Sequence, residues 1–375
     1  MRKKMTIMAL ILGVTVGSMN LVSANDDYVF ENNKDGTCKI IKTGKFENVE
    51  ELSVPIISAD GKQVTELEDY TFYKCEAQTF ILSNMEGELN NGILEYGECK
   101  NIVIENCKLK IGDNFASNME DIESLTITNC ELEFDDYAFF KLGDDAVVNI
   151  SNSKVEFDSA AFEYSGIKEM TIDSCEIKAD GSFMSNSEDL TLLIMKDSSL
   201  EFKDYAFYKL GDKAEVSITG CTGEFENAVF EYAEIAELYL DNCELEFGNS
   251  AFSNNDKLKK IKVGDGKYFF GEYSFYKCSR ADEFIIGGQS KDNEYEIDDA
   301  FGEYCSKLQS LELGEGKFEI GSNFFANCKL LSEVTISEKC DLEIEDYAFY
   351  GASENLQIFW ENQEYDIVAF SSLIN

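Results

Sequence analysis

Pairs of apolar residues separated by a single variable residue recur along most of the chain. Leu125 and Ile127 form one such pair, and Val216 and Ile218 form another. A period of two places successive side chains on opposite faces of an extended strand. A second apolar alternation, such as Leu132-Glu133-Phe134, follows about five residues later. The pattern therefore predicts two short, half-buried β-strands in each segment.

An aromatic element follows each pair of predicted strands. It reads as an aromatic or small residue, then Ala, Phe and a further aromatic residue, as in Tyr205-Ala206-Phe207-Tyr208. Most neighbouring copies lie 21 to 26 residues apart, and Ile93 fills the one wide gap. This gives fourteen units, the last of them truncated. We expect a short helical turn at the aromatic element, so that each unit is one coil.

The units also fall into groups of three. The form that begins with Tyr recurs at Tyr70, Tyr137, Tyr205, Tyr273 and Tyr347, after 67, 68, 68 and 74 residues. The middle unit of each group carries Glu-Tyr, and the third carries Phe-x-x-Asn. One coil cannot bury both its strand face and its phenylalanine, whereas stacked coils share a continuous core. The sequence therefore predicts a single solenoid domain.

The unit resembles the BspA-like leucine-rich repeats, in which Ala-Phe-x-x-Cys is followed by Leu-x-x-Ile. Phe72-Tyr73-Lys74-Cys75 and Phe325-Ala326-Asn327-Cys328 carry the resemblance. It implies an α/β repeat fold: a β-rich leucine-rich-repeat solenoid with short helical turns at its corners and an N-terminal β-hairpin cap. We expect a signal peptide at residues 1–24, the β cap at 25–61 and the solenoid at 62–375, with its truncated last unit as a C-terminal cap.

The beginning of the chain indicates export. Arg2, Lys3 and Lys4 precede an apolar run, and Val22-Ser23-Ala24 matches a small-residue cleavage site. The run is short and interrupted by glycine, and no second apolar segment follows, so no transmembrane span is expected. The protein is therefore expected to be secreted or extracellular, and its family resemblance implies association with the cell surface.

The charge of the chain excludes several classes of function. It has 73 acidic and 32 basic residues, a formal net charge of −41, and no histidine. Such a surface repels phosphate, which argues against nucleic acid and anionic lipid as partners. Without histidine the chain lacks the usual imidazole base. Every acidic position also has near-copies in other repeats, whereas catalysis needs one unique site, so we expect no enzyme activity.

One residue between each inward apolar pair is expected to point outward. These residues vary while their apolar neighbours do not, as expected of a surface that reads a ligand. Their chemistry is mostly small, hydroxylic and apolar, which suits a protein or a glycan, although simple solvent exposure is the alternative. The candidate ligand-binding residues are Thr126, Asn149, Thr171, Leu193, Ser217, Tyr239, Lys262 and Ile285.

A column of glutamates precedes the corners. Stacked carboxylates about 4.8 Å apart repel one another, and calcium accepts irregular sets of oxygen ligands, so cations could bridge the coils. The alternative is a solvated acidic face, because no calcium-binding loop sequence accompanies the column. The candidate calcium ligands are Glu133, Glu156, Glu201, Glu224 and Glu246. No other cofactor is expected.

The twelve cysteines follow the repeat. One position of the repeat is occupied by Ser153 and Ser198 in two units and by cysteine in six others: Cys107, Cys130, Cys175, Cys221, Cys243 and Cys340. A second position of the repeat holds Cys75, Cys278 and Cys328. Cys38, Cys99 and Cys305 match neither position. Cysteines at equivalent positions of the repeat favour a buried ladder of mostly free thiols over a disulfide framework, although a few disulfide bonds could still form.

The recurrent corner tyrosines allow two interpretations. Tyr137, Tyr205, Tyr273 and Tyr347 could stack against sugars. Their fixed place beside the corner phenylalanine favours a packing role instead.

The sequence as a whole predicts a secreted or cell-surface binding protein. The family resemblance implies adhesion to a host or matrix protein. The variable outward residues add a glycan as a second class of ligand and indicate the strand face of the solenoid as the contact surface. The alternative is a structural, calcium-bridged surface protein that assembles with itself, which the acidic column and the free repeat ends favour. The sequence does not identify the ligand or the oligomeric state.

Overall fold

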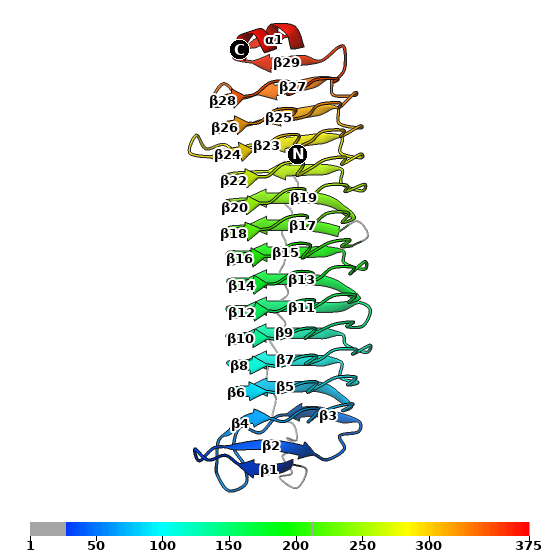
Figure 1. Cartoon of the computed structure of the whole chain (residues 1–375), viewed down its shortest axis with the longest axis vertical. Coiled ribbons are helices and arrows are strands. Elements are labelled where there is room, and N and C mark those ends of the chain that lie inside the picture. The colour runs from blue at the N-terminus through cyan, green and yellow to red at the C-terminus, as the bar shows by residue number, and fades with distance from the viewer. Residues whose placement is uncertain (1–27, 212–213, 375) are drawn as a thin grey trace, which may run out of the picture.

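A computed structural model describes residues 28–211 and 214–374, which form an elongated stack of coils (Figure 1). Two sheets of fifteen strands each run along the stack. Sheet A contains β1 (Tyr28–Asn32), β2 (Cys38–Thr43), β4 (Val64–Leu67), β6 (Glu86–Leu89), β8 (Lys108–Ile111), β10 (Glu131–Phe134), β12 (Lys154–Phe157), β14 (Glu176–Ala179), β16 (Ser199–Phe202), β18 (Thr222–Phe225), β20 (Cys243–Phe247), β22 (Gly266–Phe270), β24 (Glu294–Ile297), β26 (Gly316–Ile320) and β28 (Cys340–Ile344).

Sheet B contains the other strand of each coil. Its members are β3 (Val49–Ser53), β5 (Ala77–Ser83), β7 (Asn101–Glu105), β9 (Ser124–Thr128), β11 (Ala146–Ser151), β13 (Ile167–Asp173), β15 (Leu192–Lys196), β17 (Ala214–Thr219), β19 (Ile235–Asp241), β21 (Lys260–Val263), β23 (Glu283–Ile286), β25 (Ser310–Leu313), β27 (Glu333–Ile336), β29 (Gln357–Trp360) and β30 (Gln363–Tyr365). Neighbouring coils pair in parallel, so that Leu132 lies opposite Val155 and Phe134 opposite Phe157. The strands predicted from the alternating apolar pairs are confirmed.

The corner between each sheet A strand and the following sheet B strand is not helical. The corner at Tyr137–Lys141 donates three backbone N–H groups to the next coil: Tyr137 to Ser159 O (3.1 Å), Phe139 to Ala161 O (2.7 Å) and Lys141 to Glu163 O (3.1 Å). In an α-helix these groups would bond to carbonyls four residues earlier. The same pattern repeats at Tyr205, Phe207 and Lys209.

Left-handed backbone angles explain why no helix forms at these corners. Tyr137 has a φ of 60° and Lys141 a φ of 54°, and neither angle fits a right-handed helical turn. The predicted α/β fold with helical corners is therefore wrong. The chain is a β-solenoid whose third side is a ladder of hydrogen-bonded turns, and α1 (Ile367–Ile374) is the one helix in the described part of the chain.

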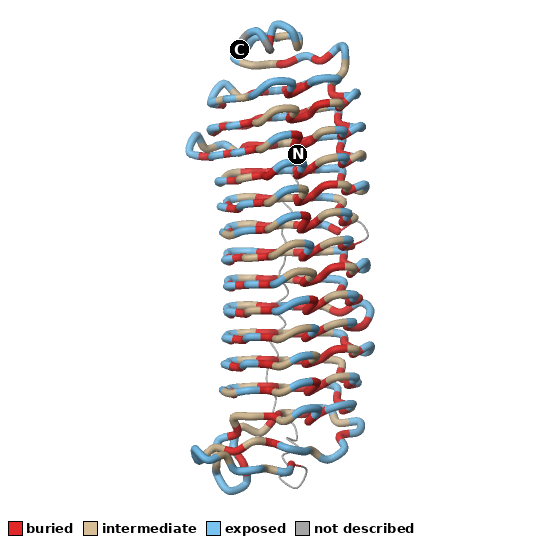
Figure 2. The backbone as a smooth tube through the Cα atoms, in the orientation of Figure 1, coloured by how far each residue is buried: buried red, intermediate tan, exposed pale blue. Residues whose placement is uncertain are grey.

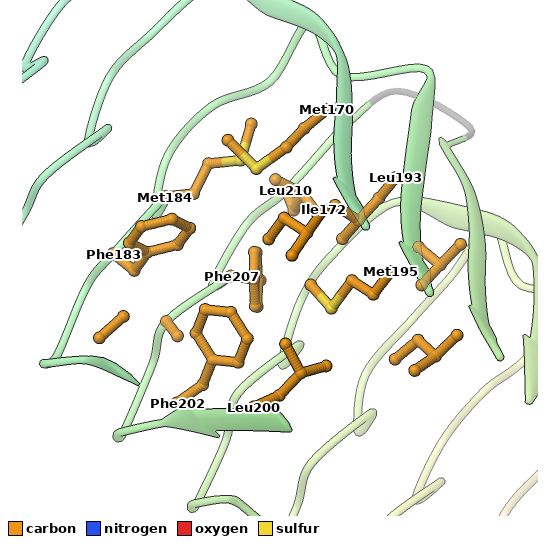
Figure 3. Packing of buried hydrophobic residues seen from close by; sticks show 14 of the residues in the cluster. Met170, Ile172, Phe183, Met184, Leu193, Met195, Leu200, Phe202, Phe207 and Leu210 are labelled. Carbon is orange, nitrogen blue, oxygen red and sulfur yellow. The ribbon is translucent and has the colours of Figure 1, made fainter. Parts of the chain in front are cut away.

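The core is a column of aromatic and aliphatic side chains that runs between the sheets and the corner. Phe207, Phe230, Phe252 and Phe275 stack nearly face to face, with ring centroids 4.8, 5.1 and 4.8 Å apart. Phe207 also packs against Phe183 and Phe202, as Figure 3 shows. Along each coil the buried residues alternate with exposed ones (Figure 2), because the strand pleat sends every second side chain inward.

Two polar ladders lie inside this core. In the first, the Cys107 N–H donates to Cys130 Sγ (3.4 Å), and the Cys130 N–H donates to Ser153 Oγ (3.0 Å). The sulfur or hydroxyl therefore satisfies a buried backbone donor of the preceding coil, which explains why Cys and Ser share this position of the repeat. All twelve cysteines are buried free thiols. Burial raises the pKa of the Cys340 thiol to about 12, so this thiol is protonated at neutral pH.

The second ladder includes two cysteines that match neither position of the repeat in the sequence. Cys278, Cys305 and Cys328 occupy successive coils, and each thiol donates to a backbone carbonyl at 3.3 Å. Cys99 faces Cys75, with the two Sγ atoms 3.5 Å apart. Cys305 did not match when counted from the corner phenylalanines, because Gly302 rather than Phe301 occupies the position of Phe275 and Phe325.

Hairpins lie at both ends of the described chain. At the N-terminal end β1 pairs antiparallel with β2, and Tyr28 packs on Phe46 and Phe72. Sheet B already begins at β3, inside the segment expected to be a separate cap. At the C-terminal end β29 pairs antiparallel with β30, and Phe370 of α1 packs on Phe349 and Trp360. The expected signal peptide lies outside the described residues.

The stacked phenylalanines predict a large effect for a single truncation. Phe207→Ala should lower the free energy of unfolding by about 3 to 5 kcal/mol, because it removes contacts with three rings and leaves a cavity in a dry core. Urea denaturation followed by circular dichroism measures the change. The exposed control Glu215→Ala should stay within about 0.5 kcal/mol of the parent, and an equal effect of both substitutions would contradict the packing described here.

Candidate binding surface

The outward residues of sheet B form one straight row across the coils. The register pairs Thr126 with Asn149, Asn149 with Thr171, and Ser217 with Tyr239. The row continues from Tyr239 to Lys262 and from Lys262 to Ile285. Seven of the eight predicted ligand-binding residues therefore lie together on one face, about 4.8 Å from coil to coil.

Leu193 is the exception, and its predicted position is wrong. It is buried with 0% of its surface exposed, and Ile194 takes the outward place between Thr171 and Ser217. The strand reads Leu192-Leu193-Ile194-Met195, so apolar residues occupy both phases of the period of two. Met195 lies opposite Ile172 in the core and sets the true phase.

The row is uncharged over eight coils. Ile81 and Val103 extend it beyond Thr126, so that it runs from Ile81 to Tyr239 without an acidic or basic side chain. Tyr239 closes this stretch. Its hydroxyl donates to Asp241 Oδ2 (3.0 Å), and Lys262 Nζ lies 5.3 Å from its ring centroid. Burial raises the pKa of Tyr239 to about 12, and the hydrogen bond with the Asp241 carboxylate adds to this increase. The Tyr239 hydroxyl therefore keeps its proton at neutral pH.

Sheet A presents the opposite chemistry. Its outward row places Glu133 next to Glu156, and Glu201 next to Glu224 and then Glu246. Lys178 stands between Glu156 and Glu201, and Phe269 follows Glu246. The five predicted calcium ligands thus form two short runs rather than one continuous column.

Lysines already neutralise part of these runs. Lys203 Nζ lies 2.8 Å from Glu201 Oε1, and Lys154 Nζ lies 3.7 Å from Glu156 Oε1. The ammonium of Lys203 lowers the pKa of Glu201. Within residues 28–211 and 214–374, no group of three or more acidic or cysteine side chains is arranged to hold a metal ion.

A shallow depression lies on sheet A above Gly87. Glu86, Glu88, Lys108, Lys110, Glu131 and Glu133 line it. Lys108 Nζ lies 2.8 Å from Glu131 Oε2 and lowers the pKa of that carboxyl. A lowered pKa keeps the carboxylate charged at neutral pH, which is the reverse of what a general acid requires.

The corner tyrosines lie on the outer surface. The ring faces expected to pack beside the corner phenylalanine instead contact other surface rings, as Tyr137 does with Phe140 (centroids 5.5 Å apart) and Tyr205 with Tyr208 (5.7 Å). Tyr137 and Tyr205 are 43% and 48% exposed. These tyrosines therefore pack against other rings at the surface of the corner, and both the packing and the sugar-stacking interpretations stay predictions. The period of three coils was the sequence signal that set them apart from the core positions.

Three aspartates occupy equivalent positions in successive coils, where the corner begins. Asp135, Asp158 and Asp180 each follow the last residue of a sheet A strand, at β10, β12 and β14. Burial raises the pKa of Asp158, and the charges of Asp135 and Asp180 raise it further. The ionised form of Asp158 therefore destabilises the folded state slightly at neutral pH.

Two parallel sheets wound through hydrogen-bonded corners define a leucine-rich-repeat β-solenoid. A sequence profile described as "BspA type Leucine rich repeat region (6 copies)" matches residues 29–144, 114–236, 156–282 and 245–371. These segments together cover nearly all of the described chain. The chain belongs to the BspA-type leucine-rich-repeat family. A comparison with curated proteins found no match.

Three solved structures are similar to this chain. The pneumococcal vaccine antigen PcpA is 15% identical over 89% of this chain and 91% of its own, with a TM-score of 0.37. A leucine-rich repeat protein from Bacteroides ovatus is 14% identical over 89% of this chain and 98% of its own, with a TM-score of 0.38. A leucine-rich cell surface protein from Faecalibacterium prausnitzii is 15% identical over 96% and 98%, with a TM-score of 0.29.

The environment of Asp158 predicts a pH-dependent gain on substitution. A folded-state pKa above the unfolded value costs stability when the group is ionised, and this cost disappears as the pH falls through the raised pKa. Asp158→Asn should therefore raise the melting temperature at pH 7 by about 1 to 2 °C. The gain should vanish near pH 4. Calorimetry at both pH values measures it, with the exposed Glu188→Gln as control; a gain that persists at low pH would exclude the electrostatic cause.

Calcium tests the alternative of a cation-bridged assembly. Because lysines interrupt and pair with the glutamates of sheet A, we expect millimolar calcium to change the melting temperature by less than about 2 °C relative to chelator. Light scattering should show no calcium-dependent growth in size. An upward shift beyond 5 °C that Glu224→Gln abolishes would instead establish Glu201, Glu224 and Glu246 as calcium ligands.

Proposed function

We propose that this protein is an extracellular binding protein that attaches to a protein or glycan surface through the outward row of sheet B. Its central residues are Thr126, Asn149, Thr171, Ile194, Ser217 and Tyr239, with Lys262 and Ile285 at the C-terminal side. The expected biological role is adhesion, and the protein acts by binding rather than by catalysis.

The uncharged row in a chain of net charge −41 is the observation that carries this proposal. Charged side chains are depleted at the centres of protein interfaces because their desolvation is costly. Sheet A, by contrast, carries glutamate or lysine at nearly every outward position of its central row. Eight coils at about 4.8 Å extend the uncharged row over about 34 Å, which matches the width of a standard interface.

The row also offers the groups that fix an orientation. Thr126, Thr171 and Ser217 supply hydroxyls, and Asn149 supplies an amide, while Ile81, Val103 and Ile194 supply apolar area. Such a mixture of small polar and apolar groups supports contacts with a folded protein or with the hydroxyls of a glycan. Parallel strands hold these side chains at fixed spacings, so the surface needs little ordering on binding.

Membership of the BspA-type family and the export-like leader support an extracellular location. No helix among the described residues is long and apolar enough to cross a membrane.

A charge placed in the row tests the proposal. The chain from residue 25 onward is screened against immobilised matrix proteins and glycans, and at least one saturable partner is expected. Ile194→Glu should weaken that binding at least tenfold, because it buries an unpaired carboxylate at the centre of the contact.

The matched control lies on β16, the sheet A strand that directly follows β15 along the chain. Ser199→Glu adds the same charge at an exposed position of β16 and should leave the affinity unchanged. Equal losses for both variants would show a general electrostatic effect and would contradict a contact through sheet B. Melting temperatures of both variants exclude loss of folding as the cause.

A further inference from the structure

Four copies of an aromatic cluster line the corner side of the solenoid, away from the row of sheet B. Each copy draws two rings from one coil and one ring from the next. The four triads are Tyr70, Tyr73 and Tyr96; Tyr137, Phe140 and Tyr164; Tyr205, Tyr208 and Tyr232; and Tyr273, Tyr276 and Tyr304. We call these sets the aromatic triads.

The triads share one geometry. In the third triad Tyr205 and Tyr208 have ring centroids 5.7 Å apart at 87°, and Tyr208 and Tyr232 have centroids 5.8 Å apart at 78°. Tyr205 and Tyr232 are each 48% exposed. This exposure distinguishes the triads from the core, where perpendicular pairs such as Phe183 and Phe207 (77°) are buried.

The backbone under the outer tyrosines is in the left-handed region. Tyr205 has a φ of 61° and Tyr232 a φ of 56°, and the equivalent positions of the other triads agree within a few degrees. Bulky residues rarely adopt this conformation, whereas asparagine does so readily. The third coil of each group has asparagine at the position of Tyr232, for example Asn254 with a φ of 58°. Aromatic side chains therefore occupy places that the backbone alone would give to asparagine.

The coil beneath each leading tyrosine makes room for its ring. A Cβ atom on Gly92 would lie 2.3 Å from Cε1 of Tyr70, so the ring covers this glycine. Small residues, Ala160, Ala228 and Ala300, hold the equivalent positions beside Tyr137, Tyr205 and Tyr273. Each leading tyrosine thus has a strained backbone and a small residue next to its ring. This combination indicates a role for the rings beyond the stability of the coil.

Each triad already holds a cation. The ammonium of Lys209 lies 5.3 Å from the centroid of Tyr208, that of Lys277 4.8 Å from Tyr276, and that of Lys141 5.1 Å from Phe140. Lys74 lies over two rings, 5.2 Å from Tyr73 and 5.8 Å from Tyr96. These distances are within the range in which a ring face attracts a cation.

The surroundings of the triads add negative charge and adaptable polar groups. Glu231 precedes Tyr232 and accepts hydrogen bonds from Ser253 Oγ and Asn254 Nδ2, both at 3.2 Å. Tyr, Ser, Asn and Ala recur on this side, and these residue types are frequent in protein-binding surfaces. With a net charge of −41, long-range electrostatics favour a positively charged partner over an anionic one.

We propose that the aromatic triads are a repeated docking site for a basic polypeptide, in which each triad takes one arginine or lysine side chain in place of its resident lysine. The site lies on a different face from the surface proposed for adhesion and does not depend on it. Guanidinium groups suit it best, because they are planar, weakly hydrated and stack on aromatic faces.

The spacing of the triads sets the spacing of the basic residues. Successive triads are three coils apart, or about 14 Å. An extended polypeptide advances about 3.4 Å per residue, so one basic side chain in every four residues meets one triad after another. Contacts at several triads then reinforce one another by avidity.

The test uses a peptide probe and charge-neutral variants. The probe is a sixteen-residue peptide with Arg-Ser-Gly-Ser repeated four times, and its control has the same composition with its four arginines adjacent. Binding to the chain from residue 25 onward is measured by calorimetry at 150 mM salt. The repeated peptide should bind at least about fivefold more tightly than the control.

The double variant Tyr205→Asn/Tyr232→Asn removes two rings of one triad without changing charge, and it installs the residue that the third coil uses. Affinity should fall about two- to fivefold, and a second treated triad, Tyr137→Asn/Tyr164→Asn, should bring the loss to about tenfold or more. Melting temperatures should change by no more than a few degrees. Equal binding by all variants would assign the affinity to net charge alone and would overturn the proposal.

Two further variants separate the alternatives. Lys209→Ala should leave the affinity for the repeated peptide equal or higher, because it frees a ring face; a weaker affinity would show that the lysine itself contacts the partner, and would overturn the proposal. Ile194→Glu on sheet B should not reduce the affinity, whatever its effect on adhesion. Neutral oligosaccharides that bind the parent chain and lose binding in the tyrosine variants would identify a glycan site instead.

Discussion

The hydrogen bonds between successive coils are the constraint on which the rest of the structure depends. On sheet A, on sheet B and at the corner, backbone N–H groups of one coil donate to carbonyls of a neighbouring coil. A single coil therefore satisfies few of its own polar groups, and it exists only because neighbours complete it. The ladder also fixes the rise from coil to coil, and so it stacks Phe207 on Phe230 and Cys107 on Cys130.

Parallel, in-register stacking has an electrostatic consequence. Equivalent residues of neighbouring coils become contacts, so a charge repeated in every coil would face its own copy about 4.8 Å away. One outward row of sheet A avoids much of this repulsion by changing sign between coils, as where Lys108 meets Glu131 and Lys154 meets Glu176. The central row of sheet A instead keeps short runs of stacked glutamates. On sheet B the central row avoids it by carrying no charge across eight coils.

Much of this architecture could be predicted from the sequence, because its strongest signals are periodic. The apolar pairs located the strands, the repeat position shared by Cys and Ser located an internal ladder, and the outward row followed from the phase of each strand. The prediction for Leu193 was wrong because Leu192-Leu193-Ile194-Met195 is apolar in both phases. Only the partners of this strand across the sheet decide which residue is buried. The prediction of helical corners was wrong for a different reason. Tyrosine and lysine rarely adopt positive φ, and the destination of a corner N–H depends on a coil some 22 residues away.

The molecule has two repeat lengths superimposed on each other. The core repeats with every coil, as the stacked phenylalanines show, whereas the exposed tyrosines repeat with every third. Gain or loss of a group of three coils would change the length of the protein and its number of aromatic triads while keeping the same kind of junction between groups. Gene duplication could in this way adjust the valency of the surface in whole steps, without redesign of the interior.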